Sequence, residues 1–408
     1  MDSALRDAAT RFIEQHPESQ RLHKLSLASL PGGNTRTLLH TAPFPAFMRK
    51  GEGSVLWDED GNKYYDLVGE LSAGLYGHSH PTLQKVLTET IQNVGLSLGA
   101  TNVYEQRYAS LLCERFGLER IRFTNSGTEA NIHCLAAARK FTGRRKIIVF
   151  RGAYHGSVLS FGNGIPENNI DQADWVLLQY NDSEAVREAF SQSDDIAAVI
   201  LEGMQGAGGF ISASLEFLRT IREESERAGA PDLITLGKYL GGGLPFGAFG
   251  GRRDIMDVFN PLTPGALAHS GTFQNNTLML HSGYAGLSEV YTAEVVQSLN
   301  AQGDDLRQRL QRVFAGSKFC VTGEGSLMCV HATNVGLRAE QITCRDDVVA
   351  IEDTDLKQLF WLELVNAGFW VQSRGTITLN IAMCAAALDA FVEVVEEFCK
   401  RYRSLIVV

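Results

Sequence analysis

The sequence lacks two features that would direct the search for a function to membranes or nucleic acids. None of its 408 residues belongs to an apolar run of membrane-spanning length. Basic residues are not in excess either, because 37 Lys and Arg stand against 47 Asp and Glu, a formal charge of −10. This balance argues against nucleic acid or an anionic membrane as the main partner, although a few local arginines can still hold a small anion.

Paired cysteines are missing as well. The seven cysteines are odd in number and form no Cys-x-x-Cys motif, so they indicate neither a disulfide framework nor a zinc site. Free thiols are typical of a reducing compartment. The first 20 residues carry more acidic than basic side chains and no long apolar run, which resembles neither a signal peptide nor a transit peptide. We therefore expect a cytoplasmic protein.

The apolar pattern predicts an α/β fold in two lobes. Residues 3–28 have helical spacing, and residues 46–67 alternate as short antiparallel strands do. After residue 120, strand-like runs alternate with helices, which predicts a mostly parallel sheet covered on both faces. The runs are 121–124, 146–150, 175–179 and 196–201, followed by a helix at 215–228. Ligands of such sheets sit at the carboxyl ends of the strands.

One lysine stands at the end of a short apolar run and inside glycine-rich backbone. Lys238 follows Leu236 and Gly237 and precedes Gly241-Gly-Gly243. A desolvated lysine in such a loop is a candidate nucleophile for a carbonyl group. By itself, however, the stretch fits a turn lysine that points to water better. A phosphate-binding P-loop fits worse, because Tyr239 stands where that motif needs Ser or Thr.

Polar residues at other predicted strand ends add to this pattern. Ser126, Gly127 and Thr128 open a helix, where free backbone N–H groups and two hydroxyls can hold a phosphate, although the same triplet also serves as an ordinary cap. Tyr154 can stack on a flat ring or be an ordinary half-buried tyrosine. Arg36 alone fits a surface loop. His78 and His80 lack a third ligand nearby, which favours a structured loop over a metal site.

Together these pieces resemble a known family, the class III pyridoxal-phosphate aminotransferases, in the branch shared by glutamate-1-semialdehyde aminomutases and β-amino-acid aminotransferases. The resemblance covers nearly the whole chain, and the order and spacing of its motifs are specific. The motifs are Pro31-Gly-Gly-Asn-Thr-Arg36, Leu56-Trp-Asp-Glu-Asp-Gly61, Gly77-His-Ser-His-Pro81, Asn125-Ser-Gly-Thr-Glu-Ala130, Tyr154-His-Gly156, Glu202, Met204-Gln-Gly206, Thr235-Leu-Gly-Lys238 and Ser270-Gly-Thr272.

The resemblance implies a role for each site residue. Lys238 would bind pyridoxal 5'-phosphate covalently and later move the proton between two carbons of the substrate. Ser126, Gly127 and Thr128 would hold its phosphate, Tyr154 would stack on its ring, and Glu202 would belong to the same cofactor site. Thr272 would reach the phosphate of the other subunit, which implies a homodimer. Arg36 and Arg374 match positions that bind substrate carboxylates, as guanidinium groups do through two bonds.

The resemblance also implies fold type I, with a large domain and a smaller α+β domain. We expect an N-terminal segment at 1–60 that packs with the small domain, a large cofactor-binding domain at 61–280 and a small domain at 281–408. The expected activity moves an amino group between an amino acid, with a β-amino acid as one candidate, and a 2-oxo acid. The alternatives are a glutamate-1-semialdehyde-type aminomutase and a catalytically silent form that keeps the dimer surface.

The chain departs from the family at one place. In the family, the helix matching residues 215–228 is followed by a buried strand ending in an Asp-Glu pair and by a long loop. Here Ala230 is followed directly by Pro231. The absent Asp is the residue that keeps the pyridine nitrogen protonated. Either a gene product has lost this segment or the recorded sequence skips it, and in both cases we expect the chain as written to be a poor catalyst.

Overall fold

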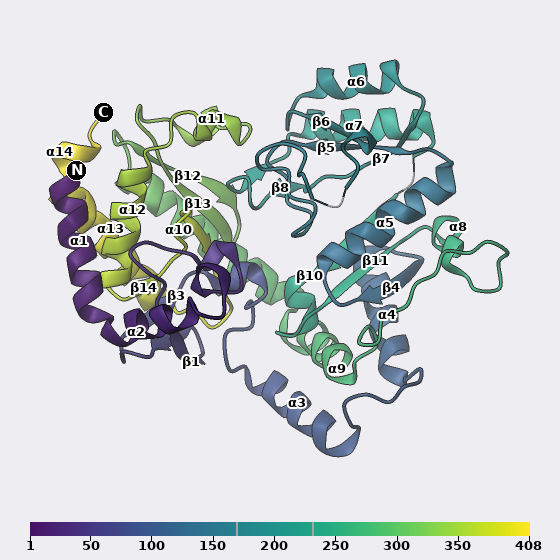
Figure 1. The fold of residues 1–408 in the computed structure, drawn as a ribbon, viewed down its shortest axis with the longest axis horizontal. Coiled ribbons are helices and arrows are strands. Elements are labelled where there is room, and N and C mark those ends of the chain that lie inside the picture. Colours follow the sequence, from purple (N-terminus) through teal and green to yellow (C-terminus); the bar gives the residue numbers. More distant parts are fainter. Residues whose placement is uncertain (169, 231) are drawn as a thin grey trace. The chain divides into compact units, whose positions relative to one another are not determined.

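The computed structural model describes residues 1–168, 170–230 and 232–408 (Figure 1). The chain forms two compact units. Unit 1 contains residues 1–80, 296–342 and 348–408, and unit 2 contains residues 81–295 and 343–347. None of the helices in the described ranges is long and apolar enough to cross a membrane. The expected domain boundaries at 60 and 280 stay a prediction.

Unit 1 contains two sheets and a set of helices. One sheet has the order β1-β2-β3-β14, with β14 parallel to β3, and the other is antiparallel with the order β12-β13-β15. The strands are β1 (Met48–Glu52), β2 (Val55–Asp58), β3 (Lys63–Asp66), β12 (Phe319–Glu324), β13 (Leu327–Ala332), β14 (Phe369–Trp370) and β15 (Thr376–Thr378). The helices that lie wholly in unit 1 are α1 (Asp2–Gln15), α2 (Pro17–Ser26), α12 (Thr354–Asn366), α13 (Ala385–Arg401) and α14 (Arg403–Ile406). Two further helices, α10 (Ala293–Val313) and α11 (Asp346–Val349), cross the boundary between the units.

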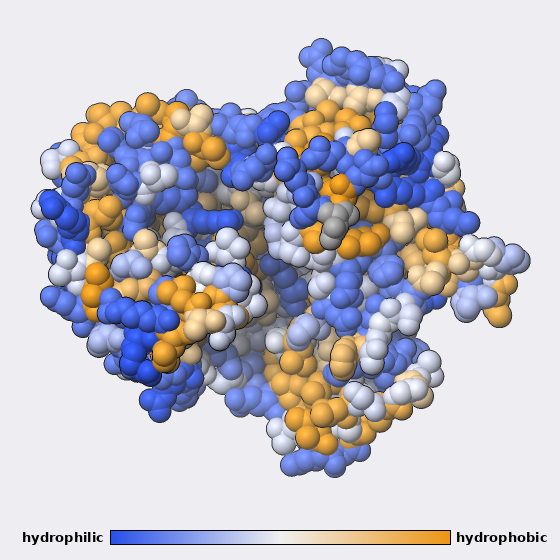
Figure 2. All heavy atoms as spheres, in the orientation of Figure 1, coloured by the Kyte–Doolittle hydropathy of each residue, from blue (hydrophilic) through white to orange (hydrophobic). Residues whose placement is uncertain are grey.

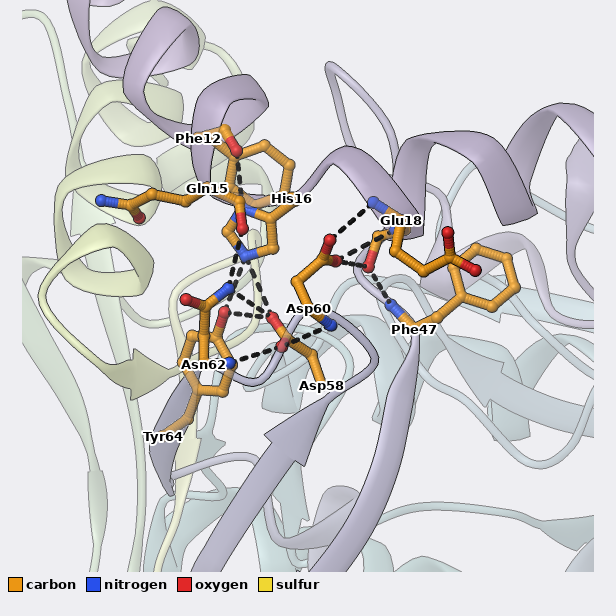
Figure 3. Close-up of polar contacts among 10 residues, drawn as sticks. Phe12, Gln15, His16, Glu18, Phe47, Asp58, Asp60, Asn62 and Tyr64 are labelled. Atoms are coloured by element: carbon orange, nitrogen blue, oxygen red, sulfur yellow. Dashed lines mark hydrogen bonds and ion pairs between the residues drawn. The ribbon is translucent and has the colours of Figure 1, made fainter.

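The N-terminal helical pattern is divided in two by His16, whose backbone leaves the helical region. Its buried ring lies 2.6 Å from the Phe12 carbonyl oxygen and 2.6 Å from the Tyr64 hydroxyl, which donates to Asp58 at 2.7 Å (Figure 3). Burial raises the pKa of Asp58, but hydrogen bonds from His16, Asn62 and Tyr64 outweigh burial and hold that pKa below its usual value. This network fixes the α1–α2 joint to the β2–β3 hairpin.

Unit 2 contains two three-stranded sheets where the sequence pattern predicted one sheet. The first has the order β6-β5-β7 and is parallel, and the second has the order β10-β11-β4 with antiparallel neighbours. Their strands are β4 (Arg120–Thr124), β5 (Lys146–Phe150), β6 (Trp175–Leu178), β7 (Ile196–Val199), β10 (Leu233–Gly237) and β11 (Gly247–Gly251). Among the described residues no strand pairs with both β7 and β10, which is the unfilled position expected where the chain departs from the family.

Helix α5 (Gly127–Thr142) packs against strands of both sheets, and Figure 1 shows it running between them. Helix α7 (Leu215–Ala228) covers β7 from another side, while α4 (Val103–Phe116) and α9 (Thr277–Ala285) pack around β11 through Tyr108, Leu280 and Phe246. The remaining elements of unit 2 are α3 (Pro81–Asn93), α6 (Ser183–Gln192), α8 (Arg253–Met256), β8 (Met204–Gln205) and β9 (Ile211–Ser212).

Candidate active site

The turn from β4 into α5 presents the beginning of a 16-residue helix. Ser126 is its N-cap, and the Ser126 hydroxyl accepts a hydrogen bond from Glu129 N at 3.2 Å. The N–H groups of a first helical turn have no partner within the helix, and the helix dipole favours an anion there. A Cβ atom on Gly127 would meet nothing within 4 Å, so this helix end is open on that side. The arrangement suits a phosphate group.

The loop after β5 passes directly beside this helix end. Ser157 N donates to the Thr128 hydroxyl at 3.3 Å, and a Cβ atom on Gly156 would lie only 2.2 Å from that hydroxyl oxygen. Gly156 also has φ of +119°, so glycine is required both for the backbone conformation and for the close approach. Tyr154, two residues earlier, is thereby held near the helix end with 47% of its surface exposed.

Glu202 follows β7 and is held by the same loop. Its carboxylate accepts hydrogen bonds from Tyr154 N at 2.9 Å and Gly206 N at 3.1 Å. Burial raises the pKa of Glu202 to about 7, although these two hydrogen bonds and the charge of Lys238 pull it down. Since Lys238 acts on this carboxyl group, the ends of β7 and β10 converge on one site.

Lys238 comes directly after β10. Its φ of +59° lies in the left-handed region, which is uncommon for a residue with a side chain. Gly237, just before it, approaches α5, because a Cβ atom there would lie 3.8 Å from the Gly127 Cα. On β11, a Cβ atom at Gly247 would lie 2.1 Å from the Ser126 carbonyl oxygen. Two close backbone approaches therefore hold the Lys238 loop against the start of α5.

The structure thus brings together six of the nine residues that the sequence indicated: Ser126, Gly127, Thr128, Tyr154, Glu202 and Lys238. They lie in unit 2, at the carboxyl ends of β4, β5, β7 and β10. Thr272 is also in unit 2 but is exposed in a turn, and no contact places it at this site within one chain. Its expected role requires a second copy and stays a prediction.

The two arginines lie in unit 1. Arg36 forms an ion pair with Glu70, and both side chains are about half exposed. Glu70 belongs to a run of four residues with positive φ, Gly69–Ser72, and positive φ is rare outside glycine. Arg374 is exposed in the turn before β15, and β15 packs against the loop that carries Glu70 through the contact of Thr378 with Gly69. Both arginines therefore lie in unit 1, next to two segments that contact each other.

Two further residues at these sites carried no assigned role in the sequence. Glu70, the partner of Arg36, has no motif around it that could have revealed the pairing. His155 lies in the Tyr-His-Gly motif, which was a signal without a role. Its ring is buried, its Nε2 has no hydrogen-bond partner among the described residues, and burial lowers its pKa to about 4. His155 is therefore neutral, and Asn131 of α5 donates to its carbonyl oxygen at 2.8 Å.

Comparison with known proteins gives this arrangement a family. The model of the class-III aminotransferases matches residues 39–230 and 225–379. The chain belongs to the class III aminotransferases. It has the α/β fold of this family and is, by homology, a pyridoxal-phosphate-dependent transaminase.

Three relatives show how similar this chain is to other members of the family. An uncharacterized aminotransferase of Schizosaccharomyces pombe is 47% identical over 97% of this chain and 95% of its own length. The β-phenylalanine transaminase of Variovorax paradoxus is 41% identical over 100% of this chain and 98% of its own length. A crystal structure of the β-phenylalanine aminotransferase from Variovorax paradoxus matches with a TM-score of 0.94 and 40% identity, and the match covers 100% of this chain and 99% of that chain. A glutamate-1-semialdehyde 2,1-aminomutase of Caldicellulosiruptor bescii is 29% identical over 92% of this chain and 96% of its own length.

These comparisons also show that some aligned positions of the relatives have no counterpart in this chain. The Variovorax alignment runs over 434 positions, but this chain has only 408 residues, so at least 26 positions have no residue here. The S. pombe alignment likewise needs 421 positions to include 97% of the chain. The two matches of the family model meet at residues 225–230.

The residues of unit 2 fit the cofactor of the family. An open helix N-terminus with two hydroxyls suits a phosphate monoester. Because residues 156 and 247 are glycines, the neighbouring backbone can pack closely against the start of α5. A half-exposed tyrosine ring and a lysine in a strained loop lie at the same strand ends. This donor set can hold a phosphorylated aromatic aldehyde.

Proposed function

We propose that this chain binds pyridoxal 5'-phosphate in unit 2 and transfers an amino group between an amino acid and a 2-oxo acid. The observation that carries the proposal is the convergence of Lys238, Glu202, Tyr154 and the Ser126–Thr128 turn at four strand ends. The first candidate for the amino acid is a β-amino acid, because the 41% identical relative is named a β-phenylalanine transaminase.

Each residue has a definite task in this proposal. Ser126, Gly127 and Thr128 bind the phosphate through hydroxyl and backbone N–H groups. The bound cofactor supplies an electron-withdrawing ring that stabilises negative charge on the carbon next to the amino group. Tyr154 orients that ring, and Lys238 anchors the cofactor and then moves a proton at its Nζ atom. Arg36 and Arg374 bind carboxylate groups of the substrate through charge-assisted hydrogen bonds.

Two other functions compete with transamination of this kind. The aminomutase reaction has weaker support, because the named aminomutase relative is 29% identical and the transaminase relative 41%. A catalytically silent protein is favoured by a specific observation, the separation of the unit 2 strands into two sheets at β7 and β10. Cofactor binding by itself therefore has to be tested separately from turnover.

The working form in this proposal is a homodimer, because Thr272 would complete the cofactor site of a second copy. Apolar side chains gather on the surface around α9 (Figure 2), where Leu96, Leu98 and Phe273 are about half or more exposed. A groove of about 950 Å³ lined by Arg122 and Ser270, among others, adjoins this region. Exposed apolar patches of this kind are typical of protein interfaces.

Borohydride labelling tests the proposal without relying on activity. We expect protein supplied with pyridoxal phosphate to gain an absorbance band, and borohydride to fix the cofactor on the peptide that contains Lys238. Reduction makes the carbon–nitrogen link permanent, so mass spectrometry can locate it. Lys238→Ala should abolish the label, whereas Lys140→Ala, at an exposed lysine near the end of α5, should leave it unchanged. Label on other lysines with none on Lys238 would refute the assignment.

A further inference from the structure

Strands β7 and β10 each leave one edge unused. Among the described residues, β7 pairs only with β5 and β10 pairs only with β11. Along each remaining edge, the backbone N–H and C=O groups of every second residue have no partner strand. Ile234, on β10, keeps 42% of its surface exposed although it lies within a strand of the large unit.

Both edges border the same space, because one helix spans it. Leu135 and Ala138 of α5 pack in a core cluster with β5 and β7, whereas Ala130 and Ala137 pack in a second cluster with Phe249 of β11. The two clusters share no residue. We call the space between the two strand edges, on the α5 side, the β7–β10 gap.

The two edges run in the same direction. Their carboxyl ends lie at the same end of α5. After β7, Glu202 accepts a hydrogen bond from Tyr154 N in the loop that contacts Thr128, and at the end of β10 a Cβ atom on Gly237 would lie 3.8 Å from the Gly127 Cα. At the opposite end, Arg144 donates to Ile196 O, at the start of β7, and to Ala228 O, five residues before β10 begins. Five residues reach at most about 18 Å. If one strand fits between β7 and β10, these two strands lie about 9–10 Å apart, which is two strand spacings. The five residues that lead from Ala228 to β10 are long enough to cross this distance.

The break between the two family-model matches lies next to this gap, because the matches overlap at residues 225–230, at the end of α7 and the start of its connection to β10. In addition, at least 26 aligned positions of the Variovorax relative have no counterpart in this chain. A segment of that length holds one strand of about five residues and a loop. Pro231, at the predicted junction, lies outside the described residues.

We propose that the β7–β10 gap is a strand-acceptor site, and that its occupant is the absent segment, which this chain can take up as a separate peptide. The peptide binds as one extended strand, parallel to β7 and β10, and joins the two sheets through backbone hydrogen bonds on both of its edges. Main-chain pairing of this kind is the general way in which a sheet edge binds a peptide.

The test uses the full chain and a synthetic peptide that carries the Variovorax paradoxus residues opposite the gap. We expect saturable binding in calorimetry and a melting temperature that rises with peptide concentration. Hydrogen exchange should slow at least ~10-fold at the unpaired amides of β7 and β10, and not at the edge of β6, the other outer strand of the parallel sheet.

The matched control is the same peptide with N-methyl groups at alternate strand residues. It keeps every side chain but cannot donate to one neighbouring strand, so its affinity should fall by at least ~10-fold. Equal binding of both peptides would mean that side chains alone are recognised and would overturn the proposal, as would binding without protection of β7 and β10. Protection that instead grows with protein concentration alone, together with a doubled mass, would show that a second copy fills the gap.

Discussion

The buried carboxyl group of Glu202 should make the stability of the protein depend on pH. Burial raises the pKa of Glu202 from 4.5 to about 7, so folding favours its protonated form. The corresponding stability is fully present below pH 4.5 and is lost as the pH rises through about 7. Over that window the cofactor-free protein should become less stable than a variant that lacks the ionisable group.

Glu202→Gln should therefore gain stability relative to the natural chain as the pH rises from about 4.5 to about 7, even if it loses one hydrogen bond at every pH. Calorimetric melting of cofactor-free protein at several pH values measures the difference. Glu216→Gln, at an exposed position on α7, is the control and should not reproduce the trend. A constant difference between Glu202→Gln and the natural chain across the window would contradict the burial of this carboxyl group.

The arginines of unit 1 set the expected selectivity for acids. Arg36→Ala and Arg374→Ala should each reduce the preference for a carboxylate-bearing amine over the matching amine without it by about 1.5–3 kcal/mol. Steady-state kinetics in a form that carries the absent segment would measure this. Arg49→Ala, at an exposed residue of β1, should have no such effect.

Glu70 adds an independent check on Arg36, because it already occupies this guanidinium. Glu70→Gln should strengthen carboxylate binding when Arg36 is present and have no effect in Arg36→Ala. If selectivity stays the same in all of these variants, neither arginine binds the substrate carboxylate.

At the scale of elements, the sequence predicted the strands and turns of unit 2 well. Apolar runs end at Thr124, Phe150 and Gly237, and the polar residues after them converge because parallel strands end on the same side. The sequence analysis missed the break at His16 because helical spacing continues through it, although Pro17 disfavours the helical region at the preceding residue and opens α2. What the sequence could not show is the buried contact of the His16 ring with Tyr64, 48 residues away in the chain.

The division of the sheet was also beyond pattern analysis. A helix, a glycine stop at Gly229 and an apolar run look like a complete βα unit, so the residues at 215–237 give no sign that a strand is absent. The family resemblance predicted the missing strand, and the unpaired edges of β7 and β10 agree with that prediction. In the same way, one chain cannot show whether Thr272 reaches a cofactor, because that contact would cross to another subunit.

At the scale of the molecule, unit 2 depends on α5 and on loops at the strand ends to hold two small sheets together. Three-stranded sheets with uncovered edges are weakly stabilised and prone to pair with other chains. By the family resemblance, the aspartate opposite the ring nitrogen belongs to a segment that we expect this chain to lack. The chain as written should therefore be both less stable and less active than a form that contains the segment.

Inserting between Ala230 and Pro231 the Variovorax residues that align at this junction tests this directly. We expect a higher melting temperature, slower amide exchange in β7 and β10, and transamination of a β-amino acid with 2-oxoglutarate faster by about 10²–10³-fold, the usual effect of one preorganised electrostatic partner. A Gly/Ser insert of equal length separates these effects from loop length, because it cannot form the strand. If the chain as written turns over as fast as the form with the Variovorax segment, another residue supplies the charge at the ring nitrogen, and Glu202, the carboxyl group placed beside Lys238, becomes the first one to replace.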